Sequence, residues 1–306
     1  MFTRSLRLFL SMLIVGVLAS STNAAVQDLR ALASANVDLW HHYTFEDDGA
    51  GNGREADKSG TLDLQQRDYG TGAVNQIAYM PGFDSTTFAL RPQRLADGGA
   101  GLRSGSTVDW GAQKAALTVE ALVSPQNLAG TFEGYAVSGV GYPRRAYFIM
   151  TNPNPAGDDS LVTRMGNDPV GAAPLVSSFT PDDWYYIANT YTVDGSDNQV
   201  VNSYVANLTA GETTLTQVLT NHVADDRMGG SQTLGVGILF NGTNGAFAGQ
   251  IDEVALYTDV FTQQEIQGHL DALLIPEPNA IVLLCMGGLW LIGTGWRRRE
   301  ASQARA

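Results

Sequence analysis

The segment FAGQIDEVALY at residues 247–257, followed by FTQQEI at residues 261–266, decides the fold of this 306-residue chain. The first part has the length and the β-rich composition of a strand. In the second part, Thr262 and Glu265 form the pattern of a helix-capping box. Ile266 and Leu270 continue at helical spacing. The segment therefore predicts a strand that is soon followed by one short helix.

Further strand signals precede this segment, and clusters of Gly, Asn, Asp and Pro separate them. They lie at residues 37–45, 117–123, 147–150, 184–191, 200–205 and 234–240. Pairs such as Asp194-Gly195, Asn241-Gly242 and Asn244-Gly245 are typical of hairpin turns and loops. Many short strands with Gly-rich turns predict an all-β fold, a two-sheet jelly-roll sandwich with one short closing helix. We expect a single domain at residues 37–274, with residues 25–36 as a short lead-in segment.

Five blocks of sequence occur in a characteristic order. They are LWHHYTFE at 39–46, ADKSG at 56–60, LTVEALV at 117–123, DWYYIA at 183–188 and the segment at 247–266. Together they resemble the laminin-G-like jelly roll, also known as the concanavalin A-like lectin/glucanase sandwich. The resemblance implies the fold but no single function, because this fold carries many functions.

Residues 1–24 have the three parts of a secretory signal peptide. Arg4 and Arg7 make the start basic, an apolar run follows at 8–18, and small polar residues lead to Ala24. We expect signal peptidase to cleave after Ala24. The alternative is that this segment remains as an N-terminal anchor.

Residues 275–306 show three features in a fixed order before the sequence ends. Pro276-Glu277-Pro278 comes first, an apolar stretch follows at about 279–296, and Arg297-Arg298-Arg299 stands just before the end of the sequence. The apolar stretch is long enough for a single transmembrane helix. The three arginines predict that its end lies on the cytoplasmic side of the inner membrane.

This order of features resembles the PEP-CTERM sorting signal of Gram-negative bacteria. The resemblance implies export across the inner membrane and anchoring there through the C-terminal helix. It further implies that an exosortase cuts near Pro276-Glu277-Pro278 and passes the protein to the cell surface or extracellular matrix. A plain C-terminal membrane anchor is the alternative.

The formal net charge is −13, and positive charges are concentrated at the two ends. Residues 1–24 carry two arginines and residues 279–306 carry four against one glutamate, so the remaining residues have a net charge of −18. Such an acidic domain argues against nucleic-acid binding, which depends on Lys and Arg. The one cysteine, Cys285, excludes a disulfide framework and a thiolate zinc site.

The resemblance also suggests a structural Ca²⁺ site. Ca²⁺ takes oxygen ligands from carboxylates and carbonyl groups, and members of this fold often bind it in the blocks that contain Glu46, Asp57 and Asp252. Gly60 offers a nearby carbonyl group. The alternative is that Asp57 caps its own turn and that Asp252 is an ordinary strand residue.

We predict no catalytic residue. Glucanases with this sandwich use a Glu-x-Asp-x-x-Glu strand that holds two carboxylates about 5–5.5 Å apart, and the sequence lacks this string. Asp252 and Glu253 are adjacent, so regular strand alternation directs them to opposite faces of a sheet. The same alternation separates His41 from His42, which excludes a shared metal ion.

These features predict an exported, non-enzymatic surface or matrix protein with a lectin-like domain. The expected role is adhesion or binding of extracellular polysaccharide. Tyr135, Tyr142, Tyr147 and Trp110 are aromatic candidates for stacking on a sugar ring, although Trp110 and Trp184 are better explained as core residues. The alternative function is a polysaccharide hydrolase or lyase on the same sandwich, which needs two carboxylates from distant strands in one groove.

Overall fold

The computed structural model describes most of the predicted domain. The described residues are 26, 29–46, 54–60, 62–69, 77–83, 87–95, 98–113, 115–126, 133–139, 145–152, 159–166, 173–224, 228–239 and 245–274. The predicted signal peptide, its cleavage site and the predicted sorting tail lie outside these residues. No helix within the described ranges is both long enough and apolar enough to cross a membrane.

Sheet A is the first of two large antiparallel sheets and has eight strands among the described residues. Their order is β16-β15-β14-β9-β19-β5-β4, and β1 pairs with β19. The strands are β1 (Leu39–Tyr43), β4 (Ala78–Pro81), β5 (Phe88–Arg91), β9 (Leu117–Pro125), β14 (Tyr185–Val193), β15 (Gln199–Asn207), β16 (Thr216–Val223) and β19 (Gly249–Tyr257).

Sheet B is the second large sheet, with nine strands in the described part of the chain. Their order is β13-β12-β11-β10-β18-β7-β3-β2, and β6 pairs with β7. The strands are β2 (Arg54–Glu55), β3 (Leu64–Tyr69), β6 (Gln93–Leu95), β7 (Gly98–Ser104), β10 (Gly134–Ser138), β11 (Arg145–Asn152), β12 (Ser160–Gly166), β13 (Ala173–Val176) and β18 (Gly235–Val236). A separate small ladder joins β8 (Val108–Asp109) to β17 (Ser231–Gln232).

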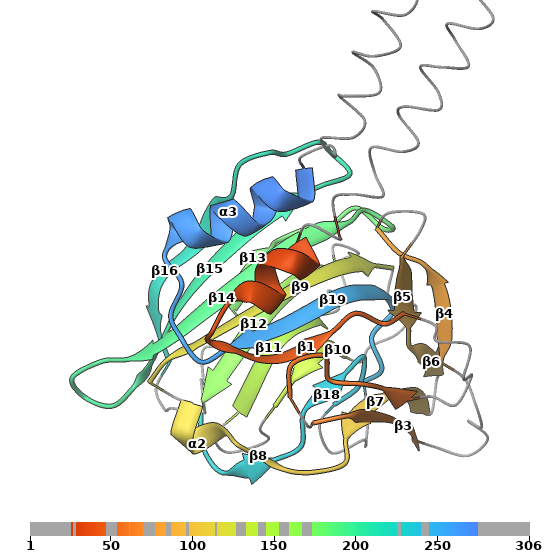
Figure 1. Cartoon of the computed structure of the whole chain (residues 1–306), viewed down its shortest axis with the longest axis horizontal. Helices are drawn as coiled ribbons and strands as arrows, with labels where there is room; N and C mark the ends of the chain where they lie inside the picture. The colour runs from red at the N-terminus through yellow and green to blue at the C-terminus, as the bar shows by residue number, and fades with distance from the viewer. Residues whose placement is uncertain are drawn as a thin grey trace, which may run out of the picture.

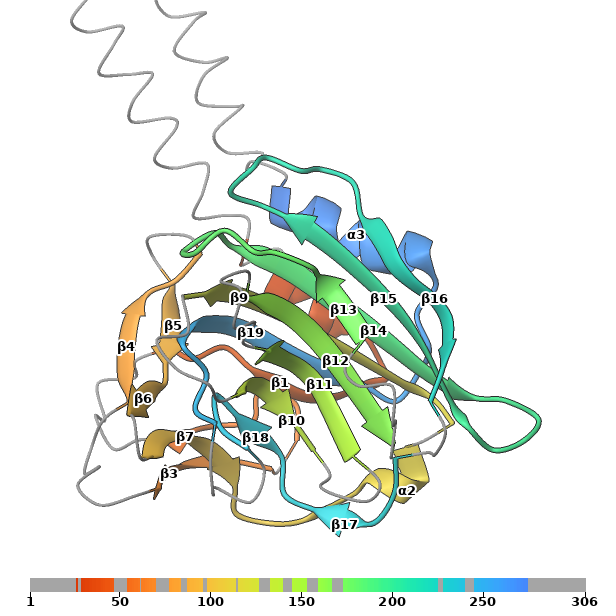
Figure 2. The same cartoon turned by 180° about the vertical axis from the view of Figure 1, so that it is seen from behind.

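The two large sheets form a sandwich with the main hydrophobic core between them (Figure 1, Figure 2). Side chains that alternate inward from both sheets fill this core, among them Tyr43, Phe148 and Tyr191. Trp110, at the start of the four-residue helix α2 (Trp110–Gln113), is fully buried in the same core. The predicted all-β sandwich is confirmed, and the predicted core role of Trp110 is confirmed with it. The same prediction for Trp184 is wrong, because Trp184 is only partly buried and packs against a second hydrophobic cluster outside the main core.

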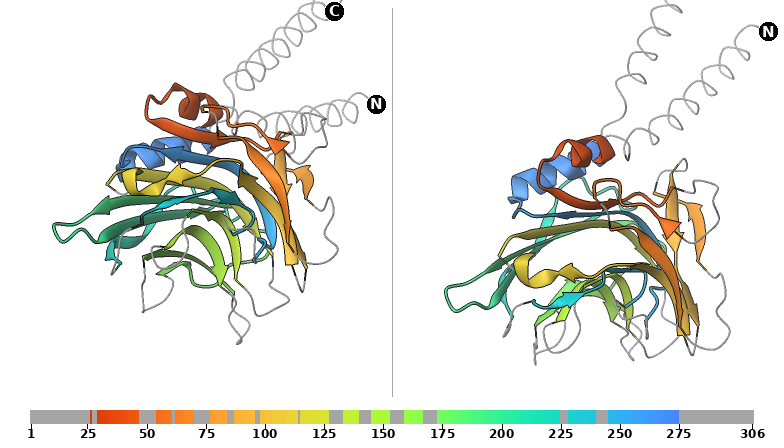
Figure 3. Two further views of the ribbon diagram at one scale, coloured as in Figure 1. Left: turned by 90° about the horizontal axis from the view of Figure 1, so that it is seen from below. Right: turned by 60° about the horizontal axis from the view of Figure 1, so that its bottom comes forward.

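Two helices lie against the outer face of sheet A (Figure 3). One is α3 (Gln263–Leu274), and the other is a helical stretch at residues 29–35. A second hydrophobic cluster joins Leu270 of α3 and Ala33 of the stretch 29–35 to sheet residues such as Tyr186. Both helices are therefore held by buried apolar contacts with sheet A.

The helix predicted from the capping box is α3. The backbone N–H of Thr262 donates to Oε2 of Glu265 at 2.7 Å, and the N–H of Glu265 donates to Oγ1 of Thr262 at 3.3 Å. The reciprocal bonds satisfy two donors that the helix itself leaves without partners. The prediction of a single helix is incomplete, because the segment predicted as a lead-in contains the helical stretch 29–35.

Candidate functional site

A β-bulge at Glu253 brings two adjacent acids to the same face of sheet A. The pairing of β19 with β9 shifts register between Asp252 and Val254, so Glu253 is the extra residue. Its φ of 48° lies in the left-handed region that a residue with a side chain seldom adopts. Asp252 and Glu253 both reach Arg30. The expectation that they point to opposite faces is therefore wrong, since regular alternation is broken at the bulge.

Arg30, in the helical stretch 29–35, lies among three acids that we name the acidic cluster: Glu46, Asp252 and Glu253. Its Nε forms an ion pair with Glu253 and its Nη1 an ion pair with Glu46. Its Nη2 donates to the carbonyl oxygen of Thr44 at 3.1 Å and lies 4.0 Å from Oδ1 of Asp252. Burial lowers the pKa of Arg30, but Glu253 and Glu46 outweigh burial and raise it. The guanidinium therefore stays charged.

Asp252 is the most deeply buried member of the acidic cluster and has no exposed surface. Its Oδ2 accepts the N–H of Phe83 at 3.0 Å and the hydroxyl of Thr87 at 3.2 Å. Its Oδ1 has no hydrogen-bond partner. Burial, and then the charge of Glu253, raise the pKa of Asp252 well above the ordinary value.

Asp57 follows β2 and caps its own turn, which is the alternative considered from the sequence. Its Oδ1 accepts the N–H of His42 and the N–H of Ser59, both at 3.1 Å. Its Oδ2 lies 2.6 Å from Nδ1 of His41. Gly60 lies directly against this carboxylate, because a Cβ at Gly60 would come within 2.5 Å of Oδ2.

His41 and His42 have different partners, as strand alternation predicts. His41 pairs with Asp57, whereas Nε2 of His42 lies 2.8 Å from Oε2 of Glu253. The two rings therefore do not share one metal ion. Each stands in a buried histidine–carboxylate pair.

The four predicted Ca²⁺ ligands fall into two groups. Glu46 and Asp252 stand around Arg30, whereas Asp57 and Gly60 stand in the turn beside His41. Across the described ranges, no three His, Cys, Asp or Glu side chains are grouped so that they could hold a metal ion. The residues fit a single Ca²⁺ ion poorly because protein donors already contact most of these oxygens.

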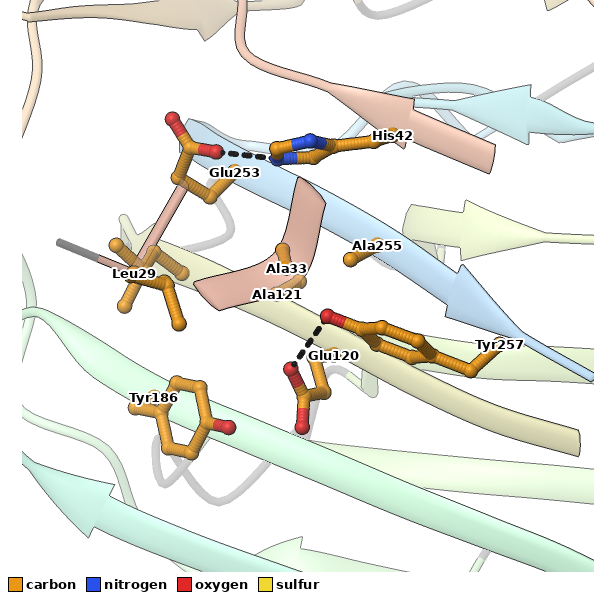
Figure 4. Close-up of a pocket in the computed structure, with 10 residues that line it drawn as sticks. Leu29, Ala33, His42, Glu120, Ala121, Tyr186, Glu253, Ala255 and Tyr257 are labelled. Atoms are coloured by element: carbon orange, nitrogen blue, oxygen red, sulfur yellow. Dashed lines mark hydrogen bonds and ion pairs between the residues drawn. The ribbon is translucent and has the colours of Figure 1, made fainter. Parts of the chain in front are cut away.

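A small cavity lies between the stretch 29–35 and sheet A, as Figure 4 shows. Its volume is about 10 Å³, close to the least that one water molecule needs. Glu120 and Glu253 both line it, together with Tyr186. The two carboxylates are turned to protein partners, Glu253 to His42 and Glu120 to Tyr257. The cavity brings two carboxylates together but has no room for a sugar ring.

Glu120 connects β9 to α3. Its Oε2 lies 2.8 Å from Nδ1 of His269 and accepts the hydroxyl of Tyr257 at 3.4 Å. Burial lowers the pKa of His269, but the charge of Glu120 and the hydrogen bond to it outweigh burial and raise the pKa. No spacing in the sequence predicts this pair, because its members come from separate elements.

The outer face of sheet B carries a third hydrophobic cluster, which contains Tyr135 and Tyr147. Their rings meet edge to face with centroids 5.0 Å apart. They are only 6% and 7% exposed, so neither ring offers a free flat surface for stacking. Trp110 lies in the main core, and Tyr142 lies outside the described residues.

Three partly exposed arginines share this outer face: Arg67 of β3, Arg103 of β7 and Arg164 of β12. Arg67 and Arg103 lie on the outer face because they alternate with core residues along their strands. Arg164 lies there because it pairs across the strands with Tyr147, which belongs to the cluster on that face. Burial and the neighbouring Arg67 lower the pKa of Arg103. Nη1 of Arg164 lies 3.6 Å from Oε1 of Glu133. Neighbouring strands lie about 4.8 Å apart, so the distance across the sheet from β12, which carries Arg164, to β7, which carries Arg103, is about 19 Å.

A family model agrees with the architecture. The model for the concanavalin A-like lectin/glucanases superfamily matches residues 97–267. No curated protein matches the chain.

Two solved structures with TM-scores of 0.50 and 0.51 show the same fold at low identity. Domain 4 of an extracellular arabinanase from Geobacillus stearothermophilus, in complex with arabinotriose, has a TM-score of 0.50 and 18% identity, covering 76% of this chain and 98% of that chain. A structure described as a receptor binding domain has a TM-score of 0.51 and 10% identity, covering 80% of this chain and 53% of that one. Botulinum neurotoxin type C, whose cell entry depends on two ganglioside molecules, has a TM-score of 0.47 and 10% identity, with coverages of 79% and 53%. This chain thus spans about half the length of the last two.

Proposed function

The chain belongs to the concanavalin A-like lectin/glucanases superfamily, and from this premise we propose that it is a non-enzymatic, carbohydrate-binding protein of the cell surface or extracellular matrix. We assign binding to the outer face of sheet B. The ligand class is a polysaccharide that carries carboxylate groups.

The distribution of positive charge carries this proposal. The domain is strongly acidic, yet Arg67, Arg103 and Arg164 lie on one face. A guanidinium presents several donors in a planar fork that matches a carboxylate. A row of such groups across the strands suits an extended anionic polymer.

The opposite side of the sandwich supports a non-enzymatic role. Retaining and inverting glycosidases both need two carboxylates on either side of the bond that is cleaved. Glu120 and Glu253 line one cavity, but the stretch 29–35 covers them and the volume is about 10 Å³. Their shared cavity is the observation that favours the second candidate, a polysaccharide hydrolase or lyase. That function requires the stretch 29–35 to move away.

A glycan array with the purified full-length protein tests the proposal and its alternative. We expect binding to polysaccharides rich in uronic acid, weaker binding to neutral ones, and no shortening of the bound chains. Absence of binding to every carboxylated glycan would contradict the binding role. Release of shorter fragments, lost in Glu120→Gln, would establish the hydrolase or lyase.

We further propose that the protein is exported and processed at both ends. The support comes from the signal peptide at residues 1–24 and from the tail at 275–306, with its Pro-Glu-Pro motif and arginine cluster. The intact mass of the protein recovered from the extracellular fraction tests this. A mass that corresponds to a start at Ala25 and an end near Pro278 is expected, whereas an uncut tail would favour a plain membrane anchor.

A further inference from the structure

We propose that the acidic cluster is a cation site whose resident cation is the guanidinium of Arg30, so that the domain folds without a divalent metal ion. The stretch 29–35 is then a structural part of the domain. It places a positive charge where β1 and β19 meet.

The guanidinium of Arg30 bridges separate segments of the chain. Its three nitrogens face oxygen atoms from different segments: Glu46 and the carbonyl of Thr44 just after β1, and Glu253 in the bulge of β19. The Arg30 side chain is only 12% exposed. Such a buried fork is held in one orientation, because a guanidinium bonds several acceptors at fixed angles.

The oxygen atoms around Arg30 are of the kinds that bind cations. Two carboxylates and one backbone carbonyl contact the guanidinium, and Oδ1 of the fully buried Asp252 faces it at 4.0 Å without a hydrogen-bond partner. Carboxylate and carbonyl oxygens are also the ligands that Ca²⁺ prefers. A positive charge is needed here because buried carboxylates without a partner are strongly destabilising. Arg30 meets this need from within the chain.

Apolar contacts anchor the helical stretch that carries Arg30. Leu29 and Ala33, on either side of Arg30 in sequence, are buried in the cluster on the outer face of sheet A. These apolar contacts hold the stretch in place, so Arg30 is directed to the bulge at Glu253. If signal peptidase cuts after Ala24, the stretch that contains Arg30 remains in the exported protein, which then carries its own cation.

The test compares thermal unfolding of the full-length protein in Ca²⁺ and in a chelator. The variants are Arg30→Gln, Arg30→Lys, Asp252→Asn and the double variant Arg30→Gln/Asp252→Asn. Arg91→Gln is the matched control, since it removes the same charge from β5, where Arg91 contacts Gln126. Calorimetric titration with Ca²⁺ alone gives a second readout.

We expect the wild-type Tm to be the same in Ca²⁺ and in chelator, with no heat of Ca²⁺ binding at this cluster. Arg30→Gln should lower the Tm by about 10 °C in Ca²⁺ and in chelator alike, because it leaves buried carboxylates without a positive charge and these acids are not grouped so that they could hold a metal ion. The double variant should not respond to Ca²⁺. Arg30→Lys keeps the charge, so it should lose less and also fail to respond.

Two results would overturn the inference. One is a wild-type protein whose Tm rises with Ca²⁺ and whose response disappears in Asp252→Asn, because a metal ion would then hold the cluster beside Arg30. The other is Arg30→Gln with the stability of the Arg91→Gln control. If Arg30→Gln does not fold, the wild-type titration and Arg30→Lys still decide the question.

Discussion

His269 of α3 and Glu120 of β9 form a buried pair, with Nδ1 of His269 2.8 Å from Oε2 of Glu120. The pair fastens the closing helix to the middle of sheet A. Since burial alone lowers the pKa of His269 and Glu120 more than offsets this, the charged imidazole is favoured in the folded protein. Stability should therefore depend on pH through this contact.

We predict that His269→Gln destabilises the protein by about 1–3 kcal/mol at pH 6 and by less at pH 9. A folded-state pKa raised above the unfolded value near 6.5 gives stability that is complete below that value. This stability is lost as the pH rises through the folded pKa. Urea unfolding of both proteins at several pH values measures the difference. A loss that is equal at both pH values would show that the imidazole acts only by packing.

We expect the buried acid Glu55 to destabilise the folded protein when its carboxyl group is charged. Its Oε1 accepts the N–H of Phe45 at 3.1 Å, but burial raises the pKa of Glu55 to about 7. For a carboxyl group whose folded pKa is raised, stability is highest below the unfolded pKa and falls as the pH rises through 7. We expect Glu55→Gln to be more stable than the wild type by about 2–3 kcal/mol at pH 8, with little difference at pH 4. Chemical unfolding at the two pH values measures this, and a variant less stable at pH 8 would contradict it.

The elements that the sequence predicts well are those with local signals. The capping box of Thr262 and Glu265 places the start of α3, and the apolar runs at 117–123 and 247–257 coincide with β9 and β19. The predicted strand at 234–240 is only the two-residue β18. The strand β3, with the sequence LQQRDY, has no clear alternation and was not predicted. Its place in sheet B comes from pairing with β7, which is a tertiary effect.

The candidate site is less predictable because its contacts join distant segments. Arg30 and Glu253 are 223 residues apart in the chain, and seven residues at 29–35 are too few to give a helix signal of their own. The bulge at Glu253 is equally hidden, since pattern reasoning assumes a regular period of two. The local part of the site is the turn in which Asp57 accepts the N–H of Ser59, and it agrees with the alternative that the residue types suggest for Asp57, not with a Ca²⁺ ligand.

Asp57→Asn tests this turn. Burial raises the pKa of Asp57, but the hydrogen bond from His41 and those from the backbone outweigh burial and lower the pKa far below the ordinary value. A depressed pKa gives stability that is present above the unfolded value near 3.9 and is lost as the pH falls below it. We expect the substitution to cost about 2–3 kcal/mol at pH 7.

The difference between wild type and Asp57→Asn should shrink in strong acid, measured by thermal unfolding between pH 7 and pH 2. Ser59→Ala is a milder control, because it removes one hydroxyl bond to Asp57 at 3.0 Å and keeps the charge. A cost for Asp57→Asn no larger than that of Ser59→Ala would refute a role for the carboxylate charge.

The arginines of sheet B should decide ligand affinity. We predict that the double variant Arg67→Gln/Arg103→Gln weakens binding to a carboxylated polysaccharide by about tenfold or more, since each charged hydrogen bond contributes about 1.5–3 kcal/mol and 1.4 kcal/mol corresponds to a factor of ten. The wild-type affinity should fall as the salt concentration rises, because salt screens exposed charges. The affinity of the double variant should depend less steeply on salt, because two of these charges are removed. Arg91→Gln, which removes the same charge from sheet A, should bind like the wild type.

Titration calorimetry with a defined uronic acid oligosaccharide measures the affinities of the wild type, the double variant and Arg91→Gln. Equal affinity of the double variant and the Arg91→Gln control would remove the outer face of sheet B as the binding surface.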